Sequence, residues 1–180
     1  MTTIRSAGHG TATQDELTEL FRGAGITHVV DVRRFPGSRR HPHVGRDRMT
    51  EWLPAASIDY RWVAELGGRR RPDPDSTHVG LRNLQFRAYA DHMETAEFAA
   101  AVDDLLGLAH AASVLVMCSE SVWWRCHRRL LADHLVLVSG VAVEHLFHDG
   151  RLADHPVTPG ARPAGDHVVY DAVPDEPGDP

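Results

Sequence analysis

Short runs of apolar residues alternate with stretches of helical periodicity along most of the chain. Strands are predicted over residues 3–9, 28–33, 58–63, 113–118 and 141–147, where apolar or β-branched residues predominate. Helices are predicted between them, over about 13–23, 46–56, 83–92, 95–110 and 123–138. Strands that alternate with helices favour an α/β fold, here a three-layer α/β/α arrangement with a mainly parallel sheet.

Local signals fix parts of this pattern. Thr13 and Glu16 have the spacing of a capping box, which predicts a helix start after the first strand. Residues 66–80 are rich in Gly, Arg, Pro and Asp and predict a long loop. We expect a single domain over residues 1–150, followed by an irregular, acidic Pro/Gly-rich tail over 151–180 with one possible strand at 167–173.

Composition narrows the class of protein. The 180 residues are 42% hydrophobic, which is enough for a sizeable core. No apolar run approaches the ~20 residues needed to span a bilayer, and the start of the chain has no apolar signal-peptide segment. Two cysteines are too few for a secreted disulfide scaffold. We therefore expect no membrane association and a cytoplasmic location.

Charge is distributed unevenly. All 19 basic residues are arginine, and the formal net charge is −6. The section from Arg33 to Arg71 nevertheless contains ten arginines and four acids, whereas residues 149–180 contain two arginines and seven acids. The basic section predicts an anionic partner, either a small molecule or a nucleic acid. A solvated face paired with the acidic tail is the alternative.

Polar residues recur at or just after the carboxyl ends of the predicted strands. These are His9, Arg33, Arg34, Ser38, Glu65, Cys118 and Glu120. In open parallel sheets, ligands bind outside the carboxyl ends of the strands. We therefore expect these side chains to lie near one another.

The segment from Cys118 to Arg128 has the clearest chemical content. A strand leads to Cys118, and the pattern predicts a helix beginning near Trp124. A helix N-terminus and nearby arginines, here Arg125 and Arg128, lower the pKa of a thiol. Cys118 is therefore a candidate nucleophile, with Glu120 and His9 as candidate acid/base groups.

Other interpretations of these residues stay open. Cys118 alone is also typical of a small buried residue at a strand end. Cys126 is either structural or able to resolve an oxidised Cys118. Asp31 lies in an apolar strand and needs a buried partner, which predicts an orienting role. Four residues of this region have side chains that can bind a metal: Cys118, Cys126, His127 and His9. Their spacing does not match the short Cys pairs of structural zinc sites, and no metal is predicted.

Several motifs, in order, resemble the domain-of-unknown-function family DUF488. They are Gly8-His9-Gly10, Val30-Asp31-Val32-Arg33, Pro36-Gly37-Ser38-Arg39, Tyr60 before Leu66-Gly67-Gly68-Arg69, Tyr89-Ala90 with Met93, Cys118-Ser119-Glu120 and Cys126-His127-Arg128. The chain departs from the family at Gly10, where the family has Ser. The resemblance covers about residues 3–147.

The resemblance implies an α/β domain whose motif residues meet in one cleft, and it implies no particular reaction. Candidate substrate-binding residues are Asp31, Arg33, Ser38, Arg39, Tyr60, Arg69, Tyr89, Trp124, Arg125, His127 and Arg128. The arginines are suited to bidentate contacts with an anion. No motif identifies a cofactor or an oligomeric state.

A weaker similarity in arrangement links the chain to rhodanese-like sulfurtransferases and Cys-dependent phosphatases. The phosphatase loop needs Cys-x5-Arg, whereas Cys118 and Arg125 are separated by six residues.

The leading hypothesis for the function is an enzyme that acts on a phosphate-bearing substrate, such as a nucleotide or nucleic acid. Alternatives are a nucleotide- or nucleic-acid-binding module without catalysis and rhodanese-like sulfur transfer.

Overall fold

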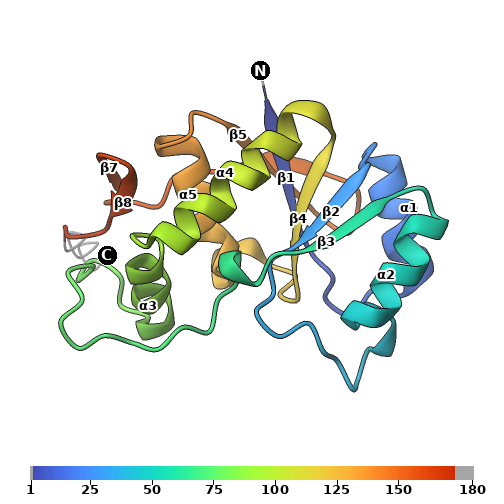
Figure 1. Ribbon diagram of the computed structural model, residues 1–180, viewed down its shortest axis with the longest axis horizontal. Coiled ribbons are helices and arrows are strands. Elements are labelled where there is room, and N and C mark those ends of the chain that lie inside the picture. Colours follow the sequence, from blue (N-terminus) through green and yellow to red (C-terminus); the bar gives the residue numbers. More distant parts are fainter. Residues whose placement is uncertain (1, 173–180) are drawn as a thin grey trace, which may run out of the picture.

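The chain forms one mixed α/β domain around a six-stranded sheet. A computed structural model describes residues 2–172 (Figure 1). The strands lie in the order β3-β2-β4-β1-β5-β6, and all but β6 run parallel. Their bounds are β1 Thr3–Gly8, β2 His28–Asp31, β3 Asp59–Trp62, β4 Val114–Cys118, β5 Ala142–Leu146 and β6 Leu152–Asp154. The predicted fold class and the predicted parallel sheet are confirmed.

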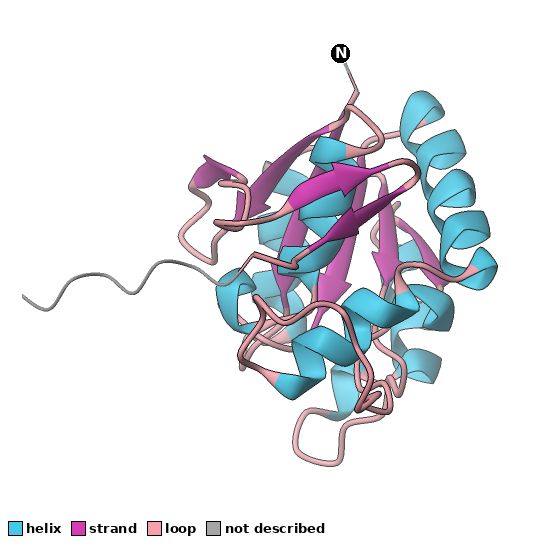
Figure 2. Ribbon diagram, turned by 90° about the vertical axis from the view of Figure 1, so that its left-hand side faces the viewer, coloured by secondary structure: helices cyan, strands magenta, loops and turns pink. Residues whose placement is uncertain are grey.

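Helices cover both faces of the sheet, which makes three layers (Figures 1 and 2). One face is covered by α1 (Gln14–Gly23) and α2 (Arg46–Ala55), and the other by α3 (Leu84–His92), α4 (Ala96–Ala111) and α5 (Arg128–Leu137). Short 3-10 turns are η1 (Pro42–Val44), η2 (Ala64–Leu66) and η3 (Trp123–Arg125). The longest helix, α4, has 16 residues, and no helix within residues 2–172 has the length and apolarity to cross a membrane.

The central strand β4 shows why this sequence forms a buried sheet. Val114, Val116 and Cys118 face the cluster under α3, α4 and α5. Leu115 and Met117 face the opposite cluster under α1 and α2. Because successive side chains of a strand point to opposite faces, a strand covered on both sides must be continuously apolar. Cys118 is thereby placed on the α5 side of the sheet.

Helix starts follow the sequence signals. Thr13 accepts a hydrogen bond from the Glu16 backbone at 3.2 Å, and the Glu16 carboxylate accepts one from the Thr13 backbone at 2.7 Å. The predicted capping box is therefore confirmed. Asn83 and Thr95 cap α3 and α4 with their side chains alone: Asn83 accepts from the backbone N–H groups of Gln85 and Phe86, and Thr95 from that of Phe98.

The last described residues also contain short strands. Besides β6, a hairpin is formed by β7 (Arg162–Ala164) and β8 (His167–Val169). β8 occupies part of the possible strand at 167–173, whose final residue lies outside the described part of the chain. Val168 and Tyr170 are buried against the α5 cluster, and the Tyr170 hydroxyl donates to Asp133 at 2.8 Å. The segment after Gly150 thus contributes side chains to the core as far as Tyr170.

A buried histidine in α5 makes stability depend on pH. Burial is the main cause that lowers the pKa of His134 from 6.5 to about 4. Between pH 6.5 and pH 4 the histidine is protonated in the unfolded chain and neutral in the folded chain. The contribution of neutral His134 to the stability of the fold is therefore fully present above pH 6.5 and is lost as the pH falls toward 4. We expect His134 to cost about 2 kcal/mol of stability at pH 5 relative to pH 7.5.

Urea unfolding of the wild type and His134→Gln at both pH values checks this prediction. The variant lacks the titrating ring, so the difference in unfolding free energy between the two proteins should change by about 2 kcal/mol from pH 7.5 to pH 5. A constant difference between the two proteins across this range would contradict it.

Candidate anion-binding thiol site

The carboxyl ends of neighbouring strands converge as the polar pattern predicts. In the sheet register Gly8 lies beside Cys118, and Asp31 lies beside Met117. The adjoining loops stay attached beyond the strands: the His9 backbone donates to the Cys118 carbonyl at 2.9 Å, and Gly10 donates to that of Ser119 at 3.0 Å. The segments after β1, β2 and β4 therefore form one rim.

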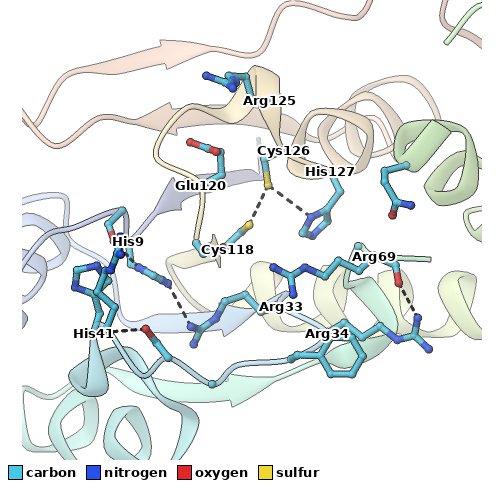
Figure 3. Close-up of a pocket in the computed structure, with 18 of the residues that line it drawn as sticks. His9, Arg33, Arg34, His41, Arg69, Cys118, Glu120, Arg125, Cys126 and His127 are labelled. Atoms are coloured by element: carbon cyan, nitrogen blue, oxygen red, sulfur yellow. Dashed lines mark hydrogen bonds between the residues drawn. The ribbon is translucent and has the colours of Figure 1, made fainter. Parts of the chain in front are cut away.

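A cleft of about 610 Å³ opens at this rim. Figure 3 shows charged and thiol side chains from separate elements around it. Five arginines line the cleft: Arg33, Arg34, Arg40, Arg69 and Arg125. Glu120 is the one carboxylate among its lining residues. Of these arginines, Arg33 pairs with Asp31, whereas the other four take part in no ion pair within residues 2–172. The cleft is therefore suited to an anion.

A buried ion pair forms one wall. Asp31 is fully buried and accepts hydrogen bonds from the Arg33 guanidinium at 2.6 and 2.8 Å. The Tyr60 hydroxyl donates to the same carboxylate at 2.7 Å. Burial, followed by the Asp31 charge, raises the pKa of Tyr60, so the hydroxyl remains a donor. Asp31 and Tyr60 thus orient Arg33.

His9 completes this wall. Its Nδ1–H donates to the Gly10 carbonyl at 2.9 Å, and its Nε2 accepts from Arg33 Nη1 at 3.3 Å. Burial is the main cause that lowers the pKa of His9 to about 4, so the ring is neutral at pH 7. Both ring nitrogens are thereby occupied, and an acid/base role for His9 stays a prediction.

The two thiols meet at the floor of the cleft. Cys118 and Cys126 are both buried, and their Sγ atoms are 3.0 Å apart. The hydrogen bond from Cys126 outweighs burial and lowers the pKa of the Cys118 thiol well below 9.0, with further help from His127. Burial raises the pKa of Cys126. These opposite shifts favour Cys118 as the thiol that ionises first, with Cys126 donating to it.

His127 lies against the same sulfurs. Its Nε2–H donates to the Val32 carbonyl at 3.0 Å, which leaves the Nδ1 lone pair 3.6 Å from Cys126 Sγ. A Cβ at Gly68 would lie 2.9 Å from this Nδ1, so the second glycine of the Leu-Gly-Gly motif gives the ring its space. The motif at the start of the long loop thus positions an imidazole in the cleft.

The predicted helix over 123–138 begins later than the pattern indicates. Residues 123–125 form η3, Cys126 is extended (φ −124°, ψ 152°), and α5 starts at Arg128. The helix N-terminus expected near Trp124, which was to lower the pKa of Cys118, is therefore wrong. The interruption has a chemical consequence, because the extended Cys126 returns toward Cys118 across an eight-residue separation.

The other candidate residues divide between the cleft and its support. Glu120, Ser38, Arg69 and Arg125 line the cleft, whereas Arg39, Trp124 and Glu65 lie outside its lining. Tyr89 and Arg128 are buried beneath it: the Tyr89 hydroxyl donates to the Leu66 carbonyl, and Arg128 donates to the Ser6 hydroxyl and the Glu120 carbonyl. Substrate contact by the residues outside the lining stays a prediction.

The sequence did not single out Arg40, His41, Phe35, Gln85 and Phe86 as site residues, although all line the cleft. Arg34, which also lines it, was expected among the polar residues at the strand ends. Arg34 and Arg40 belong to the basic section, so the local excess of arginine is the sequence feature that points to them. Gln85 and Phe86 begin α3 and carried no chemical signal of their own. The positive charge of the cleft therefore comes from the loop after β2, from Arg69 after η2 and from Arg125 in η3, and α3 adds Gln85 and Phe86 to its lining.

Comparisons with known proteins give one match. A search of curated proteins and a search of solved structures each found none. A protein-family model, described as a domain of unknown function, matches residues 13–135. This match spans more than half of the 180 residues and contains the Asp31–Arg33 pair, both cysteines and His127. By this match, and in keeping with the order of its motifs, the chain belongs to the DUF488 family.

Proposed function

We propose that the protein is an enzyme that acts on an anionic, phosphate-bearing substrate, such as a nucleotide or nucleic acid, with the Cys118 thiolate as nucleophile. One observation carries the proposal: a thiol with a lowered pKa lies at the floor of a cleft that four arginines outside ion pairs surround. A thiolate is the reactive form of cysteine. The arginines hold the anionic group through charge-assisted hydrogen bonds.

Each neighbour of Cys118 has a role in this proposal. His127 Nδ1, which faces the thiols, accepts the Cys118 proton, and the Cys126 thiol donates a hydrogen bond to the resulting anion. Glu120, at the opening of the cleft, is our candidate proton donor to the leaving group. Asp31, Tyr60 and His9 act through Arg33 and are positioning residues. The two buried free thiols suit a reducing compartment, so we assign the protein to the cytoplasm.

A nucleotide- or nucleic-acid-binding module without catalysis is the second candidate. Phe35 is 63% exposed at the cleft, and the Arg34 guanidinium lies 5.4 Å from its ring. An exposed aromatic ring beside cations is suited to stacking against a base. This candidate needs the arginines and Phe35 but makes no use of the Cys118 thiolate.

Alkylation of Cys118 by iodoacetamide, in the presence of EDTA and followed by mass spectrometry, tests the proposal. We expect a rate that rises much less between pH 6 and 8 than that of an ordinary thiol with a pKa of ~8.5, which accelerates by tens of fold. Cys126→Ala removes the hydrogen bond that lowers the pKa, so its rate at pH 6 should fall at least about tenfold.

Inorganic phosphate provides the second arm. We expect phosphate to slow alkylation of the wild type, and Arg34→Gln combined with Arg69→Gln to weaken this protection about tenfold. Arg151→Gln, at an exposed arginine outside the cleft, is the matched control and should protect like the wild type. An ordinary pH profile with intact phosphate protection would support the binding module, and no protection by phosphate would exclude both candidates.

A further inference from the structure

Three metal-ligand side chains meet at the floor of the cleft. Cys118 Sγ, Cys126 Sγ and one His127 nitrogen all lie within 4.8 Å of one another. In Figure 3 the two sulfurs and the imidazole point toward one another, with the Cys126 sulfur in the middle. Within residues 2–172 this is the group of His, Cys, Asp or Glu side chains compact enough to hold an ion.

The His127 ring is oriented as a metal-binding histidine. Such histidines almost always donate their second ring N–H to a carbonyl or carboxylate, which fixes the tautomer and directs the free lone pair at the ion. Here Nε2–H donates to the Val32 carbonyl at 3.0 Å, and Nδ1 faces the sulfurs. Gly68 leaves the space for this orientation, because a Cβ there would contact the ring at 2.9 Å.

The distances come close to those of a tetrahedral site. Zinc binds sulfur at ~2.3 Å and nitrogen at ~2.0 Å, which places tetrahedral ligands about 3.5–3.8 Å apart. Cys126 Sγ and His127 Nδ1 are 3.6 Å apart and already fit. The two sulfurs are 3.0 Å apart, so binding needs the distance between them to increase by about 0.8 Å. Small side-chain rotations suffice for this, since both thiols border the cleft.

The donor set and its surroundings favour zinc over a harder cation. Two thiolates and an imidazole are the borderline-soft ligands that Zn²⁺ takes, whereas Mg²⁺ and Ca²⁺ prefer oxygen. Two thiolates also neutralise the ion, so the zinc with its two sulfur ligands carries no net charge in a cleft that contains five arginines. Because all three ligands line the cleft, the fourth position faces its interior, as in zinc sites with three protein ligands and an open position.

We propose that Cys118, Cys126 and His127 form a three-ligand Zn²⁺ site whose fourth position opens into the arginine-lined cleft. Binding needs both sulfurs as thiolates, so any proton that Cys118 or Cys126 still carries passes to solvent. The zinc-bound protein has no free Cys118 nucleophile, so the metal-bound and free-thiol states exclude each other. The inference goes beyond the proposed function and does not depend on it, because it rests on the three ligands alone.

Titration of the full chain with Co²⁺ under a phosphine reductant tests the site. Tetrahedral thiolate ligation should produce an intense sulfur-to-cobalt charge-transfer band that saturates at one ion per chain and disappears when Zn²⁺ is added. Loss of an outer-shell partner already weakens metal sites by 10–100-fold, so we expect Cys126→Ala and His127→Gln each to weaken binding by more than about a hundredfold.

His41→Gln is the matched control, because His41 lines the same cleft but lies outside the three-ligand group. It should bind Co²⁺ like the wild type. Circular dichroism of each variant separates loss of a ligand from loss of the fold. Absence of the charge-transfer band, or a band that survives His127→Gln in a folded protein, would overturn the proposal.

The two proposals fail separately. The proposed function is tested in EDTA by the alkylation profile and by phosphate protection, neither of which involves a metal. The zinc site is tested by the cobalt band without phosphate. In addition, Zn²⁺ should protect Cys118 from alkylation in the wild type and in Arg34→Gln, and failure to protect either protein would count against the metal site.

Discussion

Asp31→Asn should destabilise the protein by about 3–5 kcal/mol, the usual cost of breaking a buried ion pair by removing one partner. Asp31 is completely buried, and Arg33 is 6% exposed. The carboxylate accepts hydrogen bonds from the Arg33 side chain, the Arg33 backbone and Tyr60. A neutral amide has one acceptor oxygen for these donors, so the substitution leaves a buried guanidinium without a counter-charge.

A graded series separates charge from hydrogen bonding. Tyr60→Phe removes one hydrogen bond to the carboxylate and should cost about 1.5–3 kcal/mol. Glu51→Gln breaks the Arg48 pair, in which both side chains are 64% exposed, and should stay within about 0.5 kcal/mol of the wild type. Urea unfolding at pH 7 measures all three.

An Asp31→Asn protein no less stable than Glu51→Gln would show that Arg33 does not depend on its partner. The consequence would reach the cleft, because Arg33 Nη1 also donates to His9. His9 in turn lies in the loop that is bonded to the Cys118 carbonyl. The expected loss of stability therefore measures how firmly one wall of the cleft is fixed.

The sheet was predictable because periodicity carries its information locally. A continuously apolar strand such as Val114–Cys118 needs cover on both faces, and parallel strands joined by helices bring their carboxyl ends to one edge. That rule predicts that His9, Arg33 and Cys118 lie near one another, and all three line the cleft. No comparable rule applies to the pairing of Cys118 with Cys126.

The thiol pair depends on a backbone interruption that helical periodicity hides. The periodicity of residues 123–138 predicts one continuous helix. In such a helix the direction of the Cys126 side chain would be set by its position in the helical turn. The chain instead forms η3 and becomes extended at Cys126 before α5. The spacing of structural zinc sites, which have short Cys pairs, did not indicate the group of Cys118, Cys126 and His127, because the two cysteines are eight residues apart. Tertiary contacts, and not local propensity, bring these ligands together.

Long polar side chains were the other limit of prediction. Arg128 has the sequence character of an anion-binding residue, yet it is 1% exposed and donates to Ser6 and Glu120. Tyr89 is likewise buried, with its ring 5.0 Å from that of His127. Composition does not distinguish an arginine in a cleft from one beneath it, since both have the same charge. Burial alone makes the distinction.

Gly8→Ala should cost about 3 kcal/mol, at the upper end of what overpacking usually costs. Gly8 ends β1 where the loop after Cys118 crosses it. A Cβ at this position would lie 1.7 Å from the Glu120 carbonyl oxygen and 2.4 Å from its carbon. These are backbone atoms, so no side-chain rotation relieves the contact. The loop must move, although its carbonyl is also held by Arg128.

Gly107→Ala is the matched control. Gly107 lies within α4, and a Cβ there would have no heavy atom within 4 Å. Because glycine destabilises a helix interior by roughly 0.5–1 kcal/mol relative to alanine, this variant should gain stability by that amount. Urea unfolding therefore compares two Gly→Ala substitutions that differ in sign for a stated structural reason.

The same variant reports on the thiol site. Movement of the loop carries Ser119 and Glu120 away from β1 and strains the backbone hydrogen bond from His9 to the Cys118 carbonyl. Cys118 then loses its position against Cys126, so the alkylation profile of Gly8→Ala should shift toward that of an ordinary thiol, whereas Gly107→Ala should keep the wild-type profile. Equal stability of the two variants would mean that the loop yields freely, and a rigid link between β1 and the cleft would then be untenable.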